Sequence, residues 1–285
     1  KKNRFYTAFK SMYRPKESDI NYLLYSSWES NKFNNTATFG WDHSYDYKKG
    51  NGNFKLEVVS STIGSDYNYA KVALTSINKS RIGKLQLNTR IFAQYGSGDN
   101  WASESQLYLA GANPEALMDH KLTRAQGFVP NDWTGYGEST NKFHMGGGLN
   151  LRGYAGYLAP ELDTEGNYTE TYVGTSGASI SAELEFHKIL PFIKRQKKLK
   201  TYFFADAGLI NTTQVTYQNW EDAFTSVRSD AGIGFALTFD RWGALETVRS
   251  FTLRVDFPIL LNKYPNVDES HLQANRFVLG IGRSF

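Results

Sequence analysis

The feature that most constrains this chain is a strict alternation of apolar and polar residues along stretches of nine to fourteen residues. Successive side chains of a β-strand point to opposite faces, so a period of two predicts strands with one apolar and one polar face. The clearest stretch is 249–257, and 177–187 and 227–240 repeat its pattern. In 249–257 the apolar residues are Phe251, Leu253, Val255 and Phe257, and the polar ones are Ser250, Thr252, Arg254 and Asp256.

The length of these stretches separates two all-β folds. A soluble sandwich would bury the apolar faces, and strands of about 5–6 residues would suffice for it. A strand that crosses a bilayer obliquely needs ~9–11 residues, which these stretches provide. Their charged residues would line the wet lumen of a wide barrel, with the apolar faces toward lipid. We therefore expect an all-β fold, a transmembrane antiparallel β-barrel over residues 1–285, in the bacterial cell outer membrane.

Composition agrees with an exported barrel and excludes several other classes of protein. Aromatic residues make up 15% of the 285 residues, and rings are favoured on pleated strands. No apolar run reaches the length of about 18 residues that a transmembrane helix needs. The absence of cysteine excludes disulfides and cysteine-based zinc sites, and a net charge of +4 does not indicate a nucleic-acid partner.

The start of the chain bears on its export. Residues 1–5 hold no apolar signal-peptide core, although a barrel of the outer membrane must be exported. We therefore expect this chain to be the C-terminal portion of a longer protein, with a periplasmic domain upstream of it.

Twelve candidate strands can be counted. They cover roughly 3–13, 20–29, 36–48, 53–63, 67–78, 81–95, 102–110, 177–187, 199–210, 227–240, 249–258 and 275–285. An even number of strands puts both termini on one side of the membrane. With a periplasmic C-terminus, the longest connections become extracellular, namely 111–176, 211–226 and 259–274. The shorter connections, 30–35, 64–66, 96–101, 188–198 and 241–248, are then periplasmic turns.

The sequence contains no recognisable catalytic, metal-binding or cofactor-binding arrangement. Its five histidines never form the His-x-x-x-His spacing of zinc hydrolases, and it has no Gly-x-Ser-x-Gly elbow. The carboxylates of Glu183 and Glu185 lie among serines and are interpreted as part of a polar lumen wall. We expect no metal and no cofactor in this chain, and whether an enzyme domain is linked upstream stays open.

Residues 111–176, here called the lid, are too long for a hairpin, and connections of this length usually carry function. Asn113-Pro114-Glu115 predicts a short helix, with Asn at the N-cap and Pro in the first turn. Three consecutive glycines at 146–148 allow tight turns and a close approach to another surface. The Leu-Arg-Gly-Tyr sequence at 151–154 follows them.

These residues carry a resemblance to a known family. The lid motif consists of Gly147, Gly148, Leu151, Arg152, Gly153 and Tyr154. It resembles the Arg-Gly-Tyr/Phe loop of the barrel-assembly insertases and two-partner-secretion transporters, the bacterial surface antigen superfamily. The segment 203–208 is similar to the family's Phe-x-Asp-x-Gly strand, and 182–186 to its glutamate-containing strand. The last strand, with Gly280, Gly282 and Phe285, resembles the family's closing strand.

The resemblance implies a site inside the barrel. In the family the sixth extracellular loop folds back into the lumen, where its arginine pairs with acidic residues. Here this implies that Arg152 pairs with Asp206, with Glu185 or Glu183 nearby. An arginine in a partly desolvated lumen needs such carboxylates, because an unpaired buried charge is costly. The pairing would lock the fold of the lid, and the motif alone does not separate that role from a role in transport.

The resemblance also bears on barrel size and function. Family barrels have sixteen strands, so the chain is either a twelve-stranded barrel or the last twelve strands of sixteen. The stretches 107–114 and 146–157 are similar to C-terminal barrels of large Bacteroidota proteins that carry a gluzincin-type aminopeptidase domain.

Three functions stay open. The barrel anchors a larger envelope protein and passes or inserts protein; or it is a dedicated outer-membrane protein insertase or secretion pore; or it is a passive porin. The expected partners are the lipid bilayer and lipopolysaccharide, together with envelope protein clients or the upstream periplasmic domain.

Overall fold

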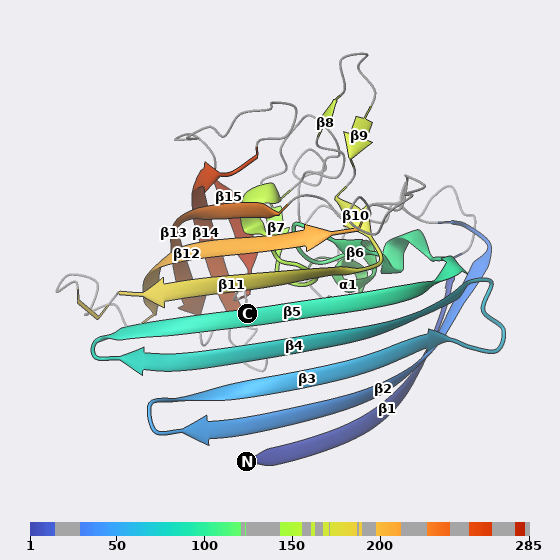
Figure 1. Ribbon diagram of the computed structural model, residues 1–285, viewed down its shortest axis with the longest axis horizontal. Helices are drawn as coiled ribbons and strands as arrows, with labels where there is room; N and C mark the ends of the chain where they lie inside the picture. Colours follow the sequence, from blue (N-terminus) through green and yellow to red (C-terminus); the bar gives the residue numbers. More distant parts are fainter. Residues whose placement is uncertain are drawn as a thin grey trace.

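Eleven strands form a single sheet in the computed structural model (Figure 1). The structure describes residues 1–14, 29–120, 123, 143–155, 161–162, 168–170, 172–186, 188–189, 198–211, 227–239, 251–263 and 277–282. In the order of the sheet the strands are β1 (Lys2–Arg14), β2 (Lys32–Tyr47), β3 (Gly50–Ser61), β4 (Asn68–Ile82), β5 (Leu85–Asn100), β11 (Gly177–Glu185), β12 (Leu199–Ile210), β13 (Arg228–Phe239), β14 (Phe251–Leu261), β15 (Val278–Ile281) and β7 (Phe143–Met145). All neighbours are antiparallel except β15 and β7, which pair in parallel. The predicted all-β, antiparallel fold is confirmed.

The connection between β5 and β11 contributes most of the smaller elements. They are η2 (Ser103–Ser105), β6 (Leu107–Tyr108), α1 (Pro114–Asp119), β7, η4 (Arg152–Tyr154), β8 (Glu161–Leu162), β9 (Tyr168–Glu170) and β10 (Val173–Gly174). β6 pairs with β10, and β8 pairs with β9. No helix within the described ranges is long and apolar enough to cross a membrane.

The two faces of the sheet differ as the alternation predicts. On β14, Leu253 and Phe257 are exposed, whereas Arg254 and Asp256 are buried. Large apolar side chains therefore stand on one face of the sheet without protein cover, as a lipid-facing surface requires. They include Phe5, Phe9, Phe39, Val58, Val72, Ile91, Ile180, Phe203, Leu237, Leu253 and Phe257.

The opposite face of β5 and β11–β15 is covered by the β5–β11 connection. Its apolar residues join side chains of the sheet in one buried cluster, which comprises Phe92, Leu107, Leu109, Leu149, Leu151, Tyr154, Tyr172, Ile210 and Leu261. In Figure 1, β6, β7 and α1 gather beside β11 and β12, while β1–β4 continue as a curved wall. The core of this protein therefore lies between the connection and the sheet.

The predicted strand at 102–110 is wrong. Residues 103–105 form η2, and only Leu107 and Tyr108 form a strand, which pairs with β10 instead of joining the large sheet. Leu107 and Leu109 are buried in the core. Alternation shows that a segment has one apolar face, but it does not show whether that face meets lipid or a protein interior.

The predicted strand at 20–29 falls almost entirely outside the described residues. β1 and β2 pair directly with each other from Lys2↔Ser44 to Arg14↔Lys32, so the sheet holds no strand between them. The count of twelve is therefore too high for the described part of the chain: besides the short β7, ten strands make up the sheet.

The predicted sides of the connections also need correction. Asn68 pairs with Asn100, so the connection 62–67 lies at the same end of the sheet as the start of the β5–β11 connection. The segments 64–66 and 111–176 had been expected on opposite sides. Residues 30–35 lie mostly in β2 and 96–100 are the end of β5, so neither range is a turn of the opposite side. Those turns are 48–49 and 83–84, and the error arose because the expected strands 20–29 and 102–110 shifted the count.

Candidate functional site

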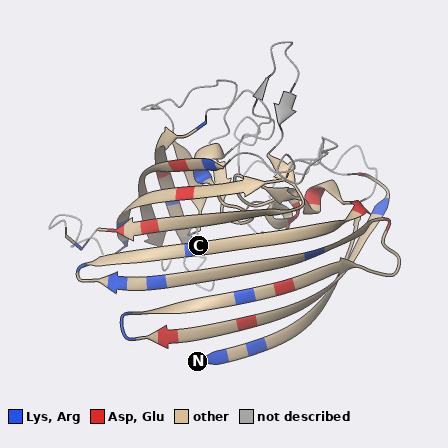
Figure 2. Ribbon diagram, viewed as in Figure 1, with Lys and Arg blue, Asp and Glu red and all other residues tan. Residues whose placement is uncertain are grey.

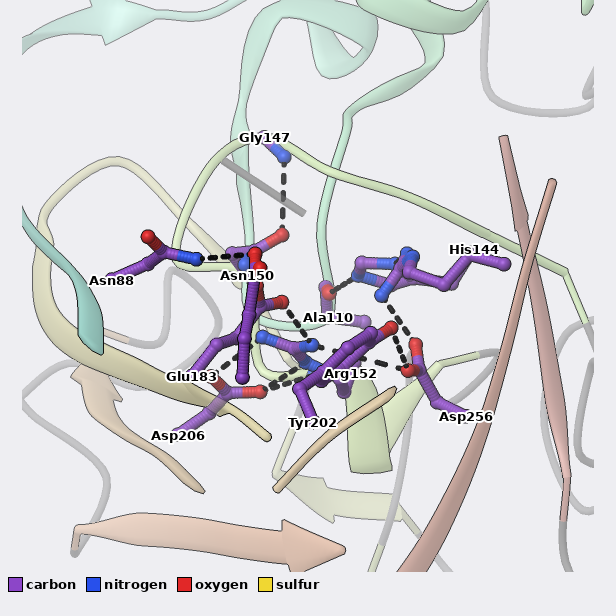
Figure 3. Close-up of polar contacts among 12 residues, drawn as sticks. Asn88, Ala110, His144, Gly147, Asn150, Arg152, Glu183, Tyr202, Asp206 and Asp256 are labelled. Carbon is purple, nitrogen blue, oxygen red and sulfur yellow. Dashed lines mark hydrogen bonds and ion pairs between the residues drawn. The ribbon is translucent and has the colours of Figure 1, made fainter. Parts of the chain in front are cut away.

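Arg152 is the centre of a buried ionic cluster beneath the lid (Figure 3). Its Nε donates to Asp206 Oδ2 at 2.7 Å and its Nη2 to Asp206 Oδ1 at 3.2 Å. Its Nη1 donates to Glu183 Oε1 at 2.8 Å. The guanidinium therefore meets the Asp206 carboxylate with two parallel hydrogen bonds, a geometry that confers directional specificity as well as attraction.

The strands position these two carboxylates. Ser181 pairs with Asp206 across β11 and β12, and Glu183 lies two residues along β11 on the same face. Both carboxylates consequently point to the side that the lid covers, while Ile180 and Phe203 point to the exposed side. Figure 2 shows acidic positions on β11 and β12 beside the lid.

Burial makes this cluster an obligate one. Arg152, Glu183 and Asp206 have exposed fractions of 0%, 1% and 2%. Burial acts to lower the pKa of Arg152, but the charges of Asp206, Glu183 and Asp256 outweigh it and raise that pKa well above its usual value. The guanidinium thus stays charged, and removing any partner would leave a charge buried without compensation.

An aromatic ring and a third carboxylate complete the surroundings of Arg152. The guanidinium carbon lies 4.4 Å from the centre of the Phe204 ring, a cation–π distance. Arg152 Nη1 is 4.0 Å from Asp256 Oδ1, which also accepts a 2.6 Å hydrogen bond from the Tyr202 hydroxyl. β11, β12 and β14 therefore all contribute contacts to one lid residue.

Gly153 and Tyr154 fix the turn that carries Arg152. A β-carbon on Gly153 would stand 2.5 Å from Cβ of Asp230 on β13, so only glycine allows the lid to approach the sheet this closely. The Tyr154 hydroxyl donates to Asn262 Oδ1 at 3.1 Å and to the Lys263 carbonyl at 2.8 Å. Leu151 is buried in the core beside Tyr154.

The glycines before Arg152 form a tight turn. Gly147 and Gly148 have φ values of 149° and 50°, which lie in the region that glycine adopts readily. A β-carbon on Gly148 would also meet the Gly111 carbonyl oxygen at 2.7 Å. The Gly148 carbonyl accepts a 2.8 Å hydrogen bond from Nη2 of Arg90, a β5 residue that the sequence reasoning missed.

A second buried ionic group lies next to the first and was also missed. Arg254 Nη1 donates to Asp256 Oδ2, and its Nη2 donates to His144 Nδ1. Because His144 Nδ1 accepts, the ring proton is on Nε2, which donates to the Ala110 carbonyl at 2.8 Å. Arg254 and Asp256 are oppositely charged at i and i+2 of the clearest alternating stretch, and this pairing was the signal that could have found them.

The other predicted site residues lie around these clusters. Glu185 accepts from Asn88 Nδ2 at 3.0 Å and lies 3.5 Å from Lys200 Nζ, so its described contacts do not go to Arg152. Gly280 lies under the Arg254 guanidinium, and Gly282 has a φ of 79°. Phe285 lies outside the described residues.

The predicted short helix is confirmed as α1. The Asn113 side chain accepts a 2.9 Å hydrogen bond from Ala116 N, and Pro114 occupies the first turn. Glu115 Oε1 lies 2.7 Å from Lys10 Nζ on β1, and its Oε2 accepts from Ser105. α1 therefore ties the lid to the strand at the far edge of the sheet.

The arrangement holds a loop in place and supplies no reacting group. The functional atoms of Arg152, Glu183 and Asp206 are taken up by one another. Among the described residues no cluster of three His, Cys, Asp or Glu side chains could hold a metal ion. The site is therefore best understood as a positioning site.

Comparison with known proteins gives one family and one fold. A family model described as the Omp85 superfamily domain matches residues 3–285. No curated protein matches the sequence significantly. The crystal structure of BamA from Haemophilus ducreyi lacking POTRA domains 1–3 is similar at a TM-score of 0.50 and 15% identity. The match covers 98% of this chain and 55% of that one, so the chain spans about half the length of the solved relative. The predicted outer-membrane β-barrel fold is confirmed by this likeness.

Proposed function

The chain belongs to the Omp85 superfamily, and from that membership we propose that it is the barrel through which an outer-membrane protein inserts or translocates β-rich polypeptides. The family match confirms the resemblance drawn from the lid motif and indicates the bacterial outer membrane as the location. The proposal concerns the activity: clients pass by or along this barrel while the lid is held inside it by Arg152.

The observation that carries this proposal is the covering of the sheet's inner face by a pinned lid. Leu149, Leu151 and Tyr154 are fully buried against the sheet, and Arg152 is held by two carboxylates. A passive porin needs a water-filled lumen, which a buried apolar core on the inner face of the wall disfavours. A barrel that handles polypeptides at its wall or seam does not need an open lumen.

The anchoring of a larger envelope protein is a second proposal. The solved relative has POTRA domains beside its barrel, as its title states, and the match covers 55% of its chain. We propose that this barrel likewise carries a periplasmic domain in the full protein, with the lid at 111–176 extracellular and the C-terminus periplasmic. The similarity to peptidase-linked barrels of Bacteroidota stays a prediction.

A reconstituted insertion assay tests the activity. The full-length protein would be placed in liposomes of outer-membrane lipids, and an unfolded eight-stranded barrel added as client. Folded client is measured as the fraction that migrates compactly on an unheated gel and resists protease. We expect at least a five-fold faster appearance of folded client than in empty liposomes.

Two variants make this assay specific. Arg152→Ala removes the lid contact, whereas Arg81→Ala removes an exposed arginine near the end of β4 and serves as the matched control. We expect the first to lose the acceleration and the second to keep it. An acceleration that is absent from the unmodified protein would refute the proposed activity.

A further inference from the structure

The edge of β15 is occupied by a piece of the lid. β15 pairs with β14 on one side and with β7 on the other. The β7 pairing is parallel and joins only Leu279↔Phe143, Gly280↔His144 and Ile281↔Met145. In the described sheet this is the single parallel contact, and it closes an edge that would otherwise present unpaired N–H and C=O groups.

One side chain holds β7 at this edge. Arg254, Gly280 and His144 form a cross-strand row, since Arg254 pairs with Gly280 and Gly280 with His144. The Arg254 guanidinium crosses above Gly280 and donates to His144. A β-carbon on Gly280 would stand 2.5 Å from Nη2 and 2.7 Å from Nε of Arg254, so the glycine makes this crossing possible.

Other contacts of β7 belong to the lid. The amide of Ala112 donates to the Met145 carbonyl at 3.0 Å, and His144 Nε2 donates to the Ala110 carbonyl. Phe143 is buried against Leu117 of α1. β7 can therefore move away with the lid, and what it would leave behind is the three-residue pairing and the contact with Arg254.

We infer that the edge of β15 is a docking surface for an extended, β-forming segment of another polypeptide, and that β7 is a built-in occupant which such a segment displaces. An antiparallel strand is somewhat more stable per residue than a parallel one, and a longer segment would form more than the three pairs that β7 forms. Backbone hydrogen bonds to a sheet edge are a general mode of peptide recognition. The inference rests on the proposed function for the identity of the incoming strand as a client's.

A pair of cysteines can fasten β7 to β15. The chain has no cysteine, so Met145→Cys with Ile281→Cys introduces the only possible disulfide, between paired residues. Leu253→Cys with Ile281→Cys is the matched control, because it joins the same position of β15 to β14 instead. Each protein is compared with itself, reduced and oxidised, after compact migration on an unheated gel shows that it is folded.

The probe is a synthetic ten-residue peptide that alternates valine and threonine and carries a benzophenone at its centre. After illumination, mass spectrometry measures how much peptide is joined to residues 278–281. We expect oxidation of the 145–281 pair to reduce this capture at least ten-fold, and oxidation of the 253–281 pair to leave it within two-fold. Gly280→Ala should raise capture several-fold, because the added methyl displaces the flexible guanidinium from His144.

Equal capture by the reduced and oxidised 145–281 protein would overturn the inference, as would capture at β1 instead of β15. Running the liposome assay beside it separates the two proposals. Normal client insertion by the oxidised 145–281 protein overturns the role of β7 and leaves the proposed function standing. Peptide capture with the expected pattern, but without client insertion, refutes the proposed function and supports the docking edge.

Discussion

Arg152 and Asp206, 54 residues apart in the sequence, are joined by two hydrogen bonds that run from one guanidinium to one carboxylate, at 2.7 and 3.2 Å. Neither residue has a measurable exposed side chain. The pair joins the lid to β12 at a place where water does not compete, so its strength depends on geometry alone. Three further groups, Glu183, Asp256 and Phe204, surround the same guanidinium.

Replacing the lid arginine should loosen the barrel. Arg152→Ala leaves Asp206 and Glu183 buried without a partner, a change that costs about 3–5 kcal/mol in other buried pairs. We expect less compactly migrating, heat-resistant barrel on a gel and a lower urea midpoint in detergent. Arg81→Ala should behave as the unmodified protein. Unchanged migration of the Arg152 variant would contradict the lock.

The two carboxylates should not contribute equally. Asp206→Asn disrupts two charge-assisted hydrogen bonds, whereas Glu183→Gln weakens one. Since hydrogen bonds to charged groups contribute about 1.5–3 kcal/mol each, the aspartate variant should lower the free energy of unfolding roughly twice as much. Glu185→Gln, which changes a residue that meets Asn88 and Lys200, is the control. A larger loss for Glu185→Gln than for Asp206→Asn would disprove this ranking.

Gly153 should tolerate no side chain. Gly153→Ala places a methyl 2.5 Å from Cβ of Asp230, and overpacking of this kind costs about 1–3 kcal/mol. Asp230→Gly removes the obstructing atoms, so the double variant should recover part of the loss relative to the sum of the single variants. Thermal unfolding of all four proteins measures this coupling. Strict additivity would show that the contact is not the cause.

The stability of the lid should fall in mild acid. Burial, with the positive charges of Arg254 and Arg152, holds the pKa of the lid residue His144 well below its usual value. The unfolded chain therefore binds a proton below about pH 6.5 that the folded chain does not. Stability should decrease as the pH falls through that range, by at most about 1.4 kcal/mol per pH unit.

Comparison with His144→Gln isolates this contribution, because the variant has no imidazole to titrate. Its free energy of unfolding should depend less on pH between 7 and 5 than that of the unmodified protein, whereas His43→Gln should show the ordinary dependence. Asp256 is the acidic group beside Arg254, and Arg254→Lys tests whether it contributes. Identical pH profiles for the unmodified protein and His144→Gln would refute the prediction.

Much of the candidate site could be predicted before the fold was known. The resemblance named Arg152, Asp206 and Glu183, and the structure brings the three together. Glu185 was named with them because it shares the face of Glu183 on β11, but it lies one pair further from Asp206 and meets Lys200. Arg90 and His144 were missed because each acts across a spacing of 34 to 110 residues that no local pattern encodes.

The sequence by itself determined which residues form strands and which face of each strand is apolar, because a period of two follows directly from strand geometry. It also determined the cap of α1 and the glycine turn before Arg152, since both depend on neighbouring residues. Only the tertiary structure decided where an apolar face is buried, as Leu107 and Leu109 show. It alone decided that β7 lies on the edge of β15, because strand pairing depends on which backbone edges meet in space and leaves no period in the sequence.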